Sequence, residues 1–477
     1  MNISVYNTPF KKKKPFTPLS GEKVGMYVCG VTVYDFSHIG HARSMIVFDV
    51  ISRFIRRKGY DLTYVRNFTD VDDKIIARAN ALGTSYKEIS EKFIDEFNKD
   101  METLKVKHAD VEPKATDYIP QIIELVRKLE EKGLAYRAAD GSVYYSVSKF
   151  REYGKLSGRR IEDMIAGARV DIEEQKRDPL DFALWKCSKE GEPSWESPWS
   201  KGRPGWHIEC SAMSTSILGP TLDIHGGGRD LIFPHHENEI AQSEGAYGVP
   251  FVRYWVHNGF VTISGEKMSK SLGNFLTIRE LAAEVHPECL RLLLISQHYR
   301  TPINFSKEAI QTSQQALVRF YEMIDRVDRS VVQGAPGRIK GLTEAFEERF
   351  DEAMCDDFNT ARAVAHLHDL TTEVNRVLDD NPAIPPEDAE ALRSSLGVVQ
   401  DVFGILEEEP GKFLEHMKRA GIAEIGISKE EIEDLIAQRA AARKARDFTK
   451  ADEIRSLLLS KGIALKDTPE GTTWEKV

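Results

Sequence analysis

His38 and His41 stand three residues apart in the run Ser37-His-Ile-Gly-His41. Ser37 suits the residue before a helix, so both histidines are expected on the first helical turn and on one side of it. Gly40 would let a flat ligand approach the backbone closely. Because the N-terminus of a helix binds phosphate through free N–H groups and its dipole, the run predicts a nucleotide site. A histidine pair at a helix start is also common as surface or capping detail.

A second run, Gly265-Glu-Lys-Met-Ser-Lys-Ser-Leu-Gly273, is flanked by glycines and carries Lys267 and Lys270. It is too polar for a core and too short for a basic tail. One interpretation is a solvated turn. The other is a mobile cationic loop that meets the charge on transferring phosphates.

A third group of residues could bind a metal ion. His235 and Glu239 are four residues apart, so one helical face would present both to one ion. Cys29 and Cys210 would complete a set of two thiolates, one imidazole and one carboxylate, which suits zinc. His236 is a rival for the place of His235. Each pattern has an ordinary alternative, because a His–Glu pair is often a surface pair and a lone cysteine is often a small core residue.

The elements that must position these residues alternate between strand and helix, as in a parallel α/β domain. Met26 to Cys29 favours a strand, and the helix after it has an inward face of Met45, Phe48, Ile51 and Ile55. Further expected elements are a strand over 62–68, helices over 72–82 and 119–132, a hairpin over 134–150, a helix over 206–218, a strand over 222–225 and a helix with Pro234 at its first position. Between about 120 and 200 the alternation is lost, which indicates an insertion.

Beyond residue 275 the pattern is helical. Long amphipathic helices over 306–331 and 342–378 predict a bundle. A small terminal unit follows residue 411, with a basic cluster of Arg439, Arg443, Lys444, Arg446 and Lys450 that would suit either RNA or a solvated helix face.

Composition fits a soluble multidomain enzyme. The chain has 477 residues and 41% hydrophobic residues, enough for two to four domains. The formal net charge of −10 does not by itself indicate a nucleic-acid binder. Five scattered cysteines argue against a disulfide scaffold, and the absence of an apolar leader or long apolar run predicts a cytoplasmic protein.

The two runs together resemble the class I aminoacyl-tRNA synthetases. His38 to His41 is similar to their first signature and Lys267 to Ser271 to their second, in the same order. The likeness extends over the whole chain to the cysteinyl-tRNA synthetase family, whose zinc ligands match Cys29, Cys210, His235 and Glu239. Thr69, Trp206 and Asp230 match that family's amino-acid pocket, although a cap, core packing and a turn are the ordinary alternatives. Val31 stands where many members carry proline, and we expect only a subtle effect on the loop.

The resemblance implies a Rossmann-like parallel-sheet catalytic domain split by an insertion, then an α-helical bundle and a small C-terminal α+β anticodon-binding domain. The implied boundaries are residues 1–120 and 201–264 for the two catalytic halves, 121–200 for the connective insertion, 265–315 for the signature-loop and stem-contact region, 316–406 for the bundle and 407–477 for the anticodon-binding domain.

The implied reaction joins L-cysteine to its tRNA through a cysteinyl-adenylate. ATP with Mg²⁺ would be bound by His38, Gly40, His41, Lys267, Ser269 and Lys270. One Zn²⁺ would select the substrate thiolate, which a serine hydroxyl cannot imitate. The resemblance also implies a monomeric protein. Trp474 could stack on an anticodon base or anchor the chain end.

Two rival functions share part of these features. A cysteine ligase that joins cysteine to an amino-sugar would have both signatures and the zinc set, but its relatives lack the full C-terminal unit. A zinc-stabilised RNA-binding protein without catalysis would not need two signature loops.

Overall fold

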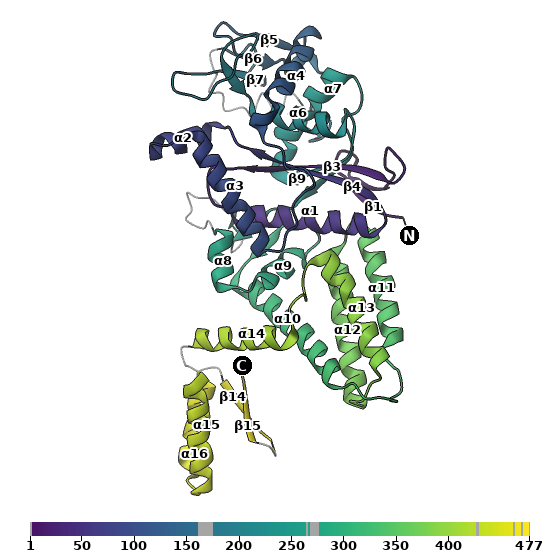
Figure 1. Cartoon of the computed structure of the whole chain (residues 1–477), viewed down its shortest axis with the longest axis vertical. Coiled ribbons are helices and arrows are strands. Elements are labelled where there is room, and N and C mark those ends of the chain that lie inside the picture. Colours follow the sequence, from purple (N-terminus) through teal and green to yellow (C-terminus); the bar gives the residue numbers. More distant parts are fainter. Residues whose placement is uncertain are drawn as a thin grey trace.

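The computed structural model describes residues 2–160, 175–263, 266–267, 276–425, 429–460, 463–468 and 471–476. Its upper half is built around a parallel four-stranded sheet (Figure 1). The strand order is β10-β9-β3-β4. The strands are β3 (Lys23–Thr32), β4 (Asp61–Thr69), β9 (Leu222–Gly228) and β10 (Val252–Asn258). The predicted parallel α/β domain is confirmed.

Alternate residues of β3 face opposite sides of this sheet, as the two-residue period of a strand requires. Met26 and Val28 pack into the core formed with helix α1 (Ile39–Arg57). Tyr27 and Cys29 instead face a second core that includes residues of α6 (Trp206–Leu218) and α7 (His235–Tyr247). The sheet therefore separates the long N-terminal helix from the two helices that carry the other predicted metal ligands.

The β9 strand is longer than its sequence suggests. Gly226 to Gly228, expected as a loop, pairs with Val256 to Asn258 of β10. A Cβ atom on Gly226 would lie 2.2 Å from the Phe48 ring, so close packing with α1 requires glycine there. Tertiary packing thus overrides the low strand propensity of the three glycines.

The insertion is a second, antiparallel sheet in the order β5-β6-β7-β8, with α4 (Ile119–Glu131) beside it. Its strands are β5 (Ala135–Arg137), β6 (Val143–Tyr145), β7 (Phe182–Cys187) and β8 (Gly202–Pro204). Its core also takes Ile208 from α6 and Ala241 from α7. Helices α6 and α7 therefore have one side on the insertion and another on the parallel sheet.

Smaller elements surround the sheet. The N-terminal hairpin is β1 (Ser4–Asn7) with β2 (Lys12–Pro15), and helices α2 (Asp73–Leu82) and α3 (Tyr86–Thr103) follow β4. A three-stranded sheet joins β11 (Val261–Ile263), β12 (Glu266–Lys267) and β13 (Ile303–Phe305), with α8 (Ile278–Glu284) and α9 (Pro287–Ile295) between β12 and β13.

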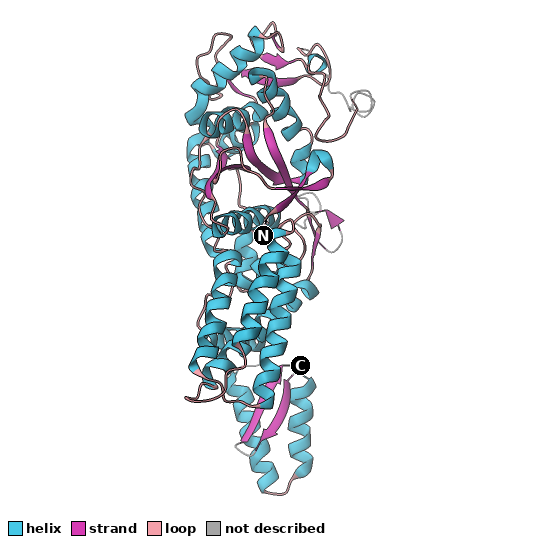
Figure 2. Cartoon of the chain, turned by 90° about the vertical axis from the view of Figure 1, so that its right-hand side faces the viewer, coloured by secondary structure: helices cyan, strands magenta, loops and turns pink. Residues whose placement is uncertain are grey.

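The helical half consists of α10 (Lys307–Arg329), α11 (Lys340–Cys355), α12 (Thr360–Asp380) and α13 (Pro386–Phe403). Figure 2 shows these helices between the strands of the upper half and the terminal hairpin. The single helix expected over 342–378 is wrong. Asp357 and Phe358 have φ values of 65° and 51° and divide it into α11 and α12.

The terminal unit comprises α14 (Pro410–Ile425), α15 (Lys429–Lys444), α16 (Phe448–Ser460), β14 (Ile463–Thr468) and β15 (Gly471–Lys476). Its basic cluster is divided: Arg439 is buried and pairs with Asp467, which ties α15 to the hairpin, whereas Lys444 and Lys450 are exposed. Trp474 packs on the small core of this unit, as an anchor would.

Within the described residues, the structure contains no helix long and apolar enough to cross a membrane.

Candidate active site

The structure brings the four predicted metal ligands together behind the parallel sheet. Cys29 comes from β3, Cys210 from α6, and His235 and Glu239 from α7. One donor atom of each lies within 4.8 Å of the others. The Cys29 and Cys210 Sγ atoms are 3.8 Å apart, and His235 Nε2 is 3.0 Å from Glu239 Oε1. None of the four residues is more than 6% exposed, so they form a buried cage of converging donors.

A bulge in β3 places Cys29 at this cage. The pairing of β3 with β4 shifts between Val28 and Val31. A Cβ atom on Gly30 would lie 1.6 Å from the carbonyl oxygen of Asn67, so only glycine allows the two strands to approach this closely. Val31, where proline was the expected residue, continues β3 opposite Phe68 and is buried.

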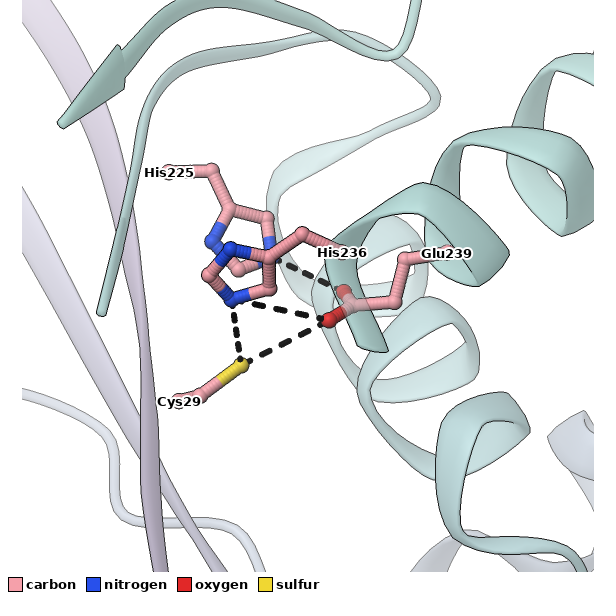
Figure 3. A group of neighbouring side chains, drawn as sticks. All are labelled: Cys29, His225, His236 and Glu239. Atoms are coloured by element: carbon pink, nitrogen blue, oxygen red, sulfur yellow. Dashed lines mark hydrogen bonds and ion pairs between the residues drawn. The ribbon is translucent and has the colours of Figure 1, made fainter. Parts of the chain in front are cut away.

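A second set of donors overlaps the first and is drawn in Figure 3: Cys29, His225, His236 and Glu239. His236 Nε2 lies 3.4 Å from Cys29 Sγ, and His225 Nε2 lies 2.8 Å from Glu239 Oε2. The two sets share Cys29 and Glu239. The rivalry between His235 and His236 is therefore present in the geometry, because Nε2 of His235 and Nε2 of His236 lie 3.0 and 4.0 Å from the same oxygen, Glu239 Oε1.

Electrostatics in the cage favour a positive charge. Burial would lower the pKa of His235, but Glu239 and Cys210 outweigh it and raise that pKa to about 10. Burial would raise the pKa of Glu239, but His225 and His235 hold it at about 2. Burial raises the pKa of the Cys29 thiol, and the hydrogen bond that Cys29 donates lowers the pKa of Cys210. The carboxylate of Glu239 and the sulfur of Cys210 thus favour a positively charged group beside them.

The first signature caps helix α1. His38, rather than Ser37, is the N-cap residue, and its Nδ1 accepts hydrogen bonds from the backbone N–H groups of Gly40 and His41 at 3.1 and 3.3 Å. The two imidazole rings stack with centroids 3.7 Å apart. Burial and the neighbouring His38 lower the pKa of His41, which keeps its ring neutral. Capping and a ligand-facing role are compatible here, because the capping hydrogen bonds use only Nδ1 of each ring.

The second signature is connected to the first through the chain that follows it. Lys267 lies in β12, opposite Thr262 of β11. Ser269 and Lys270 fall outside the described residues. Immediately after them, Leu276 accepts a hydrogen bond from the backbone of Ile39 at 3.2 Å, and Ile278 donates one to Ser37 at 2.9 Å. The chain that leaves the second signature is therefore bound to the start of the first.

Comparison with known proteins decides the family. Residues 15–315 match the family described as tRNA synthetases class I (C) catalytic domain, residues 349–407 the DALR domain, and residues 428–474 the cysteinyl-tRNA ligase anticodon binding domain. The chain is 54% identical to the cysteine–tRNA ligase of Geobacter metallireducens over 488 aligned residues, which cover 100% of both chains. It is 52% identical to that of Desulfotalea psychrophila, with 99% of each covered.

The chain belongs to the cysteine–tRNA ligase family. Solved structures of other synthetases show the same fold at low identity. A Mycobacterium tuberculosis methionyl-tRNA synthetase in complex with methionyl-adenylate aligns with a TM-score of 0.63 and 17% identity, covering 86% of this chain and 95% of that one. A Campylobacter jejuni structure described as a putative arginyl-tRNA synthetase aligns with a TM-score of 0.53 and 14% identity, covering 84% and 94%. These likenesses establish the class I synthetase fold of the family.

Three further residues matched the family's amino-acid pocket. Thr69 ends β4, is buried, and donates a hydrogen bond to Glu209 at 3.0 Å. It is not a helix cap, because Asp72 caps α2. Trp206 is 39% exposed and stacks on His235 with ring centroids 4.3 Å apart, so it is not ordinary core packing. Asp230 is exposed in the loop after β9 and lies over Gly228. Pro234, expected inside α7, is its N-cap residue.

Sequence reasoning missed several side chains around the cage. His207 Nδ1 contacts His235 Nδ1 at 2.9 Å, and His257 Nε2 contacts His236 Nδ1 at 2.8 Å. Burial lowers the pKa of His207, of His236 and of His257, so these rings are neutral. The sequence did contain a signal for this group of histidines, because five of the 13 histidines lie between residues 207 and 257.

Proposed function

We propose that this protein attaches L-cysteine to its cognate tRNA in an ATP-dependent reaction, with one Zn²⁺ ion selecting the substrate thiol. The observation that carries the proposal is the cage of Cys29, Cys210, His235 and Glu239. One of its residues, Cys29, lies on β3, and His38, the N-cap residue of α1, follows nine residues later. A thiol-selective site and a phosphate-binding helix start would thereby lie close together along the chain.

The donor set fits zinc in chemistry and spacing. Two zinc–sulfur bonds of about 2.3 Å at a tetrahedral angle would place their sulfurs about 3.8 Å apart. The two Sγ atoms are 3.8 Å apart. The first donor set contains both thiols. His225 would orient Glu239 through its contact with Oε2, as outer-shell partners of metal ligands do. When bound, Zn²⁺ would supply a soft Lewis acid that holds a thiolate and has little affinity for the serine hydroxyl.

The signature residues would act on ATP. The carboxylate of cysteine attacks the α-phosphorus, cysteinyl-adenylate forms, and pyrophosphate leaves. His38 and His41, with Gly40 between them, would stabilise the phosphate oxygens at the α1 N-terminus. Lys267, Ser269 and Lys270 would meet the β- and γ-phosphates, with Mg²⁺ accompanying ATP. In the second step a hydroxyl of the terminal tRNA ribose attacks the adenylate carbonyl, and AMP leaves.

The amino-acid backbone would be held near the cage. Trp206 would form an aromatic wall through its stacking on His235. Thr69 would offer its hydroxyl from the end of β4, and Asp230 would hold the α-ammonium from the short 3₁₀ helix after β9. The terminal unit would bind the anticodon. We further propose that the protein works as a monomer in the cytoplasm, where charged tRNA is used.

The experiment is transfer of labelled cysteine to purified cysteine tRNA with ATP, measured as acid-precipitable label. Efficient charging supports the proposal. If ATP is consumed with cysteine and the label passes to an amino-sugar instead of RNA, the ligase alternative replaces it. The match of residues 428–474 to an anticodon binding domain disfavours that alternative.

A further inference from the structure

Glu288 is a fully buried carboxylate in the first turn of α9. Its Oε2 accepts hydrogen bonds from the backbone N–H of Leu406 at 2.9 Å and from the hydroxyl of Tyr321 at 2.8 Å. Its Oε1 accepts from the backbone N–H of Glu407 at 3.2 Å and from Lys105 Nζ at 2.8 Å. Two of these four donors belong to the backbone of the segment that follows α13.

That segment, residues 404–409, is the linker between the bundle and α14. It joins the matched DALR domain, which ends at residue 407, to the matched anticodon binding domain, which begins at residue 428. Leu406 has a φ of 63°, a left-handed conformation that a leucine keeps only where its surroundings hold it. The hydrogen bond from Leu406 to Glu288 is one such restraint, so the path of the linker depends on a residue of α9.

Helix α14 carries this restraint from the linker to the terminal hairpin. In its first turn Phe413 is buried and stacks on Tyr321, the same residue that donates to Glu288, with ring centroids 4.0 Å apart. The ring of His286 packs edge-on against Phe413 at 4.9 Å. Farther along α14, Lys418 Nζ lies 4.3 Å from the ring centroid of Trp474 in β15. Figure 1 shows α14 leading from the end of α10 toward α15 and the hairpin.

We propose that Glu288 is a positioning residue for tRNA, because it holds the linker and thereby fixes α14 and the terminal unit relative to the active site. This inference rests on the proposed function. The acceptor end and the anticodon lie at opposite ends of a tRNA, so one molecule can reach both sites only when the two parts of the protein are held in a matching geometry. Cysteine activation needs no tRNA and does not depend on this geometry.

The test compares tRNA charging with cysteine-dependent ATP–pyrophosphate exchange in full-length Glu288→Gln, whose amide nitrogen cannot accept the hydrogen bonds. We expect the KM for cysteine tRNA to rise about 10-fold or more, as it would if the linker were docked less than about a tenth of the time. The kcat at saturating tRNA and the rate of exchange should stay within about threefold. Tyr321→Phe keeps the carboxylate and the ring stacked on Phe413 but loses one donor, and it should raise the KM for tRNA by about threefold.

Asp388→Asn is the matched control. Asp388 is also a buried carboxylate that accepts from the backbone of a connecting segment, at Ile339 and Lys340, but this segment lies within the bundle. The variant should leave the KM for tRNA within about twofold, even where thermal unfolding shows lower stability.

Three results would overturn the inference: an unchanged KM for tRNA in both Glu288→Gln and Tyr321→Phe, a loss of exchange as large as the loss of charging, or an equal rise in KM in Asp388→Asn. If the unsubstituted protein charges no tRNA at all, the proposed function itself has failed. Charging by the unsubstituted protein, with an unchanged KM in the variants, would refute the role of Glu288 alone.

Discussion

Two groups of buried polar side chains differ in how their atoms are matched. Between α1 and α9, Asp49 accepts a hydrogen bond from Arg291 and forms an ion pair with Arg53, whose Nε lies 2.9 Å from Asp49 Oδ2. The remaining nitrogens of Arg291 donate to the carbonyl groups of Phe403 and Leu104. Each nitrogen of Arg291 therefore meets an acceptor, and the group joins the signature helix to the end of the bundle.

In the cage on the other side of the sheet, the polar atoms are not matched as donors with acceptors. Two thiols, a carboxylate and imidazole nitrogens converge, and most of them are electron-pair donors to a cation. Burial would lower the pKa of His235, but Glu239 and Cys210 raise it to about 10, so the cage favours a positive charge at that position. A buried group whose charged atoms are paired with one another holds a fold together, whereas a buried group of converging ligand atoms suits a cation, as the proposed function requires. The difference predicts that substitutions in the first group change stability and substitutions in the second change binding.

The largest effect is expected for Cys210→Ser. Loss of one thiolate should remove bound zinc and lower cysteine activation by more than about 100-fold, beyond the usual cost of losing an outer-shell partner. The measurements are zinc content and cysteine-dependent ATP–pyrophosphate exchange. Cys187→Ser, a half-buried cysteine away from the cage, is the control and should retain both. Full activity of Cys210→Ser would show that the cage is not needed for cysteine activation.

Arg291→Met should act on stability instead. It leaves Asp49 and two carbonyl groups without their main donor, and breaking a buried pair in this way costs about 3–5 kcal/mol. The urea unfolding transition that includes α1 should shift accordingly, while the zinc content of the folded protein stays at one per chain. Arg393→Met breaks an exposed pair with Asp328 and should change stability by less than about 1 kcal/mol. Loss of zinc in Arg291→Met without destabilisation would contradict the division of roles.

A smaller effect should separate the overlapping donor sets. His235→Gln is expected to lose stoichiometric zinc. His236→Gln should keep zinc with an affinity reduced by about 10- to 100-fold, because His236 would act from the outer shell. Competition with a chromogenic chelator measures both affinities. The reverse order would assign the ligand role to His236, in the set drawn in Figure 3.

The smallest effect concerns pH. Asp357 accepts hydrogen bonds from the backbone of Tyr6 at 2.7 Å, from Tyr299 at 2.8 Å and from Arg300 at 2.9 Å. Burial would raise the pKa of Asp357, but hydrogen bonds from His298, Tyr6 and Tyr299 outweigh it and lower it. Its contribution to stability is thus present above its unfolded pKa of about 3.9 and is lost as pH falls through the lower folded value.

Thermal unfolding followed from pH 6 down to pH 3 tests this. The unsubstituted protein should lose more stability over the acid part of the range than Asp357→Asn, whose curve should be flatter. Parallel curves would show that Asp357 is not held ionised by these contacts.

The sequence predicted those parts of the site that carry local signals. His38 with His41, and His235 with Glu239, are pairs on one helical turn. Cys29 and Cys210 could be predicted because thiolates are common zinc ligands. Contacts between distant residues had no such signal. Thr69 and Glu209 are 140 residues apart, and Asp49 and Arg291 are 242 apart. Neither pair could be assigned without the fold.

Errors in the predicted elements have the same cause. The break between α11 and α12 depends on Asp357 in a left-handed conformation, which its contacts with Tyr6 and Tyr299 stabilise from elsewhere in the chain. The strand through Gly226 to Gly228 depends on the Phe48 ring. In both places tertiary contacts outweighed a local preference that favoured another conformation.

The central claim is that the cage selects the substrate by its sulfur. X-ray absorption at the zinc edge, on the full-length protein with and without cysteine, tests this most directly. The account predicts two sulfur neighbours of zinc in the protein alone, from Cys29 and Cys210, and a third when cysteine is added but not when serine is added. An unchanged sulfur count on adding saturating cysteine would contradict it.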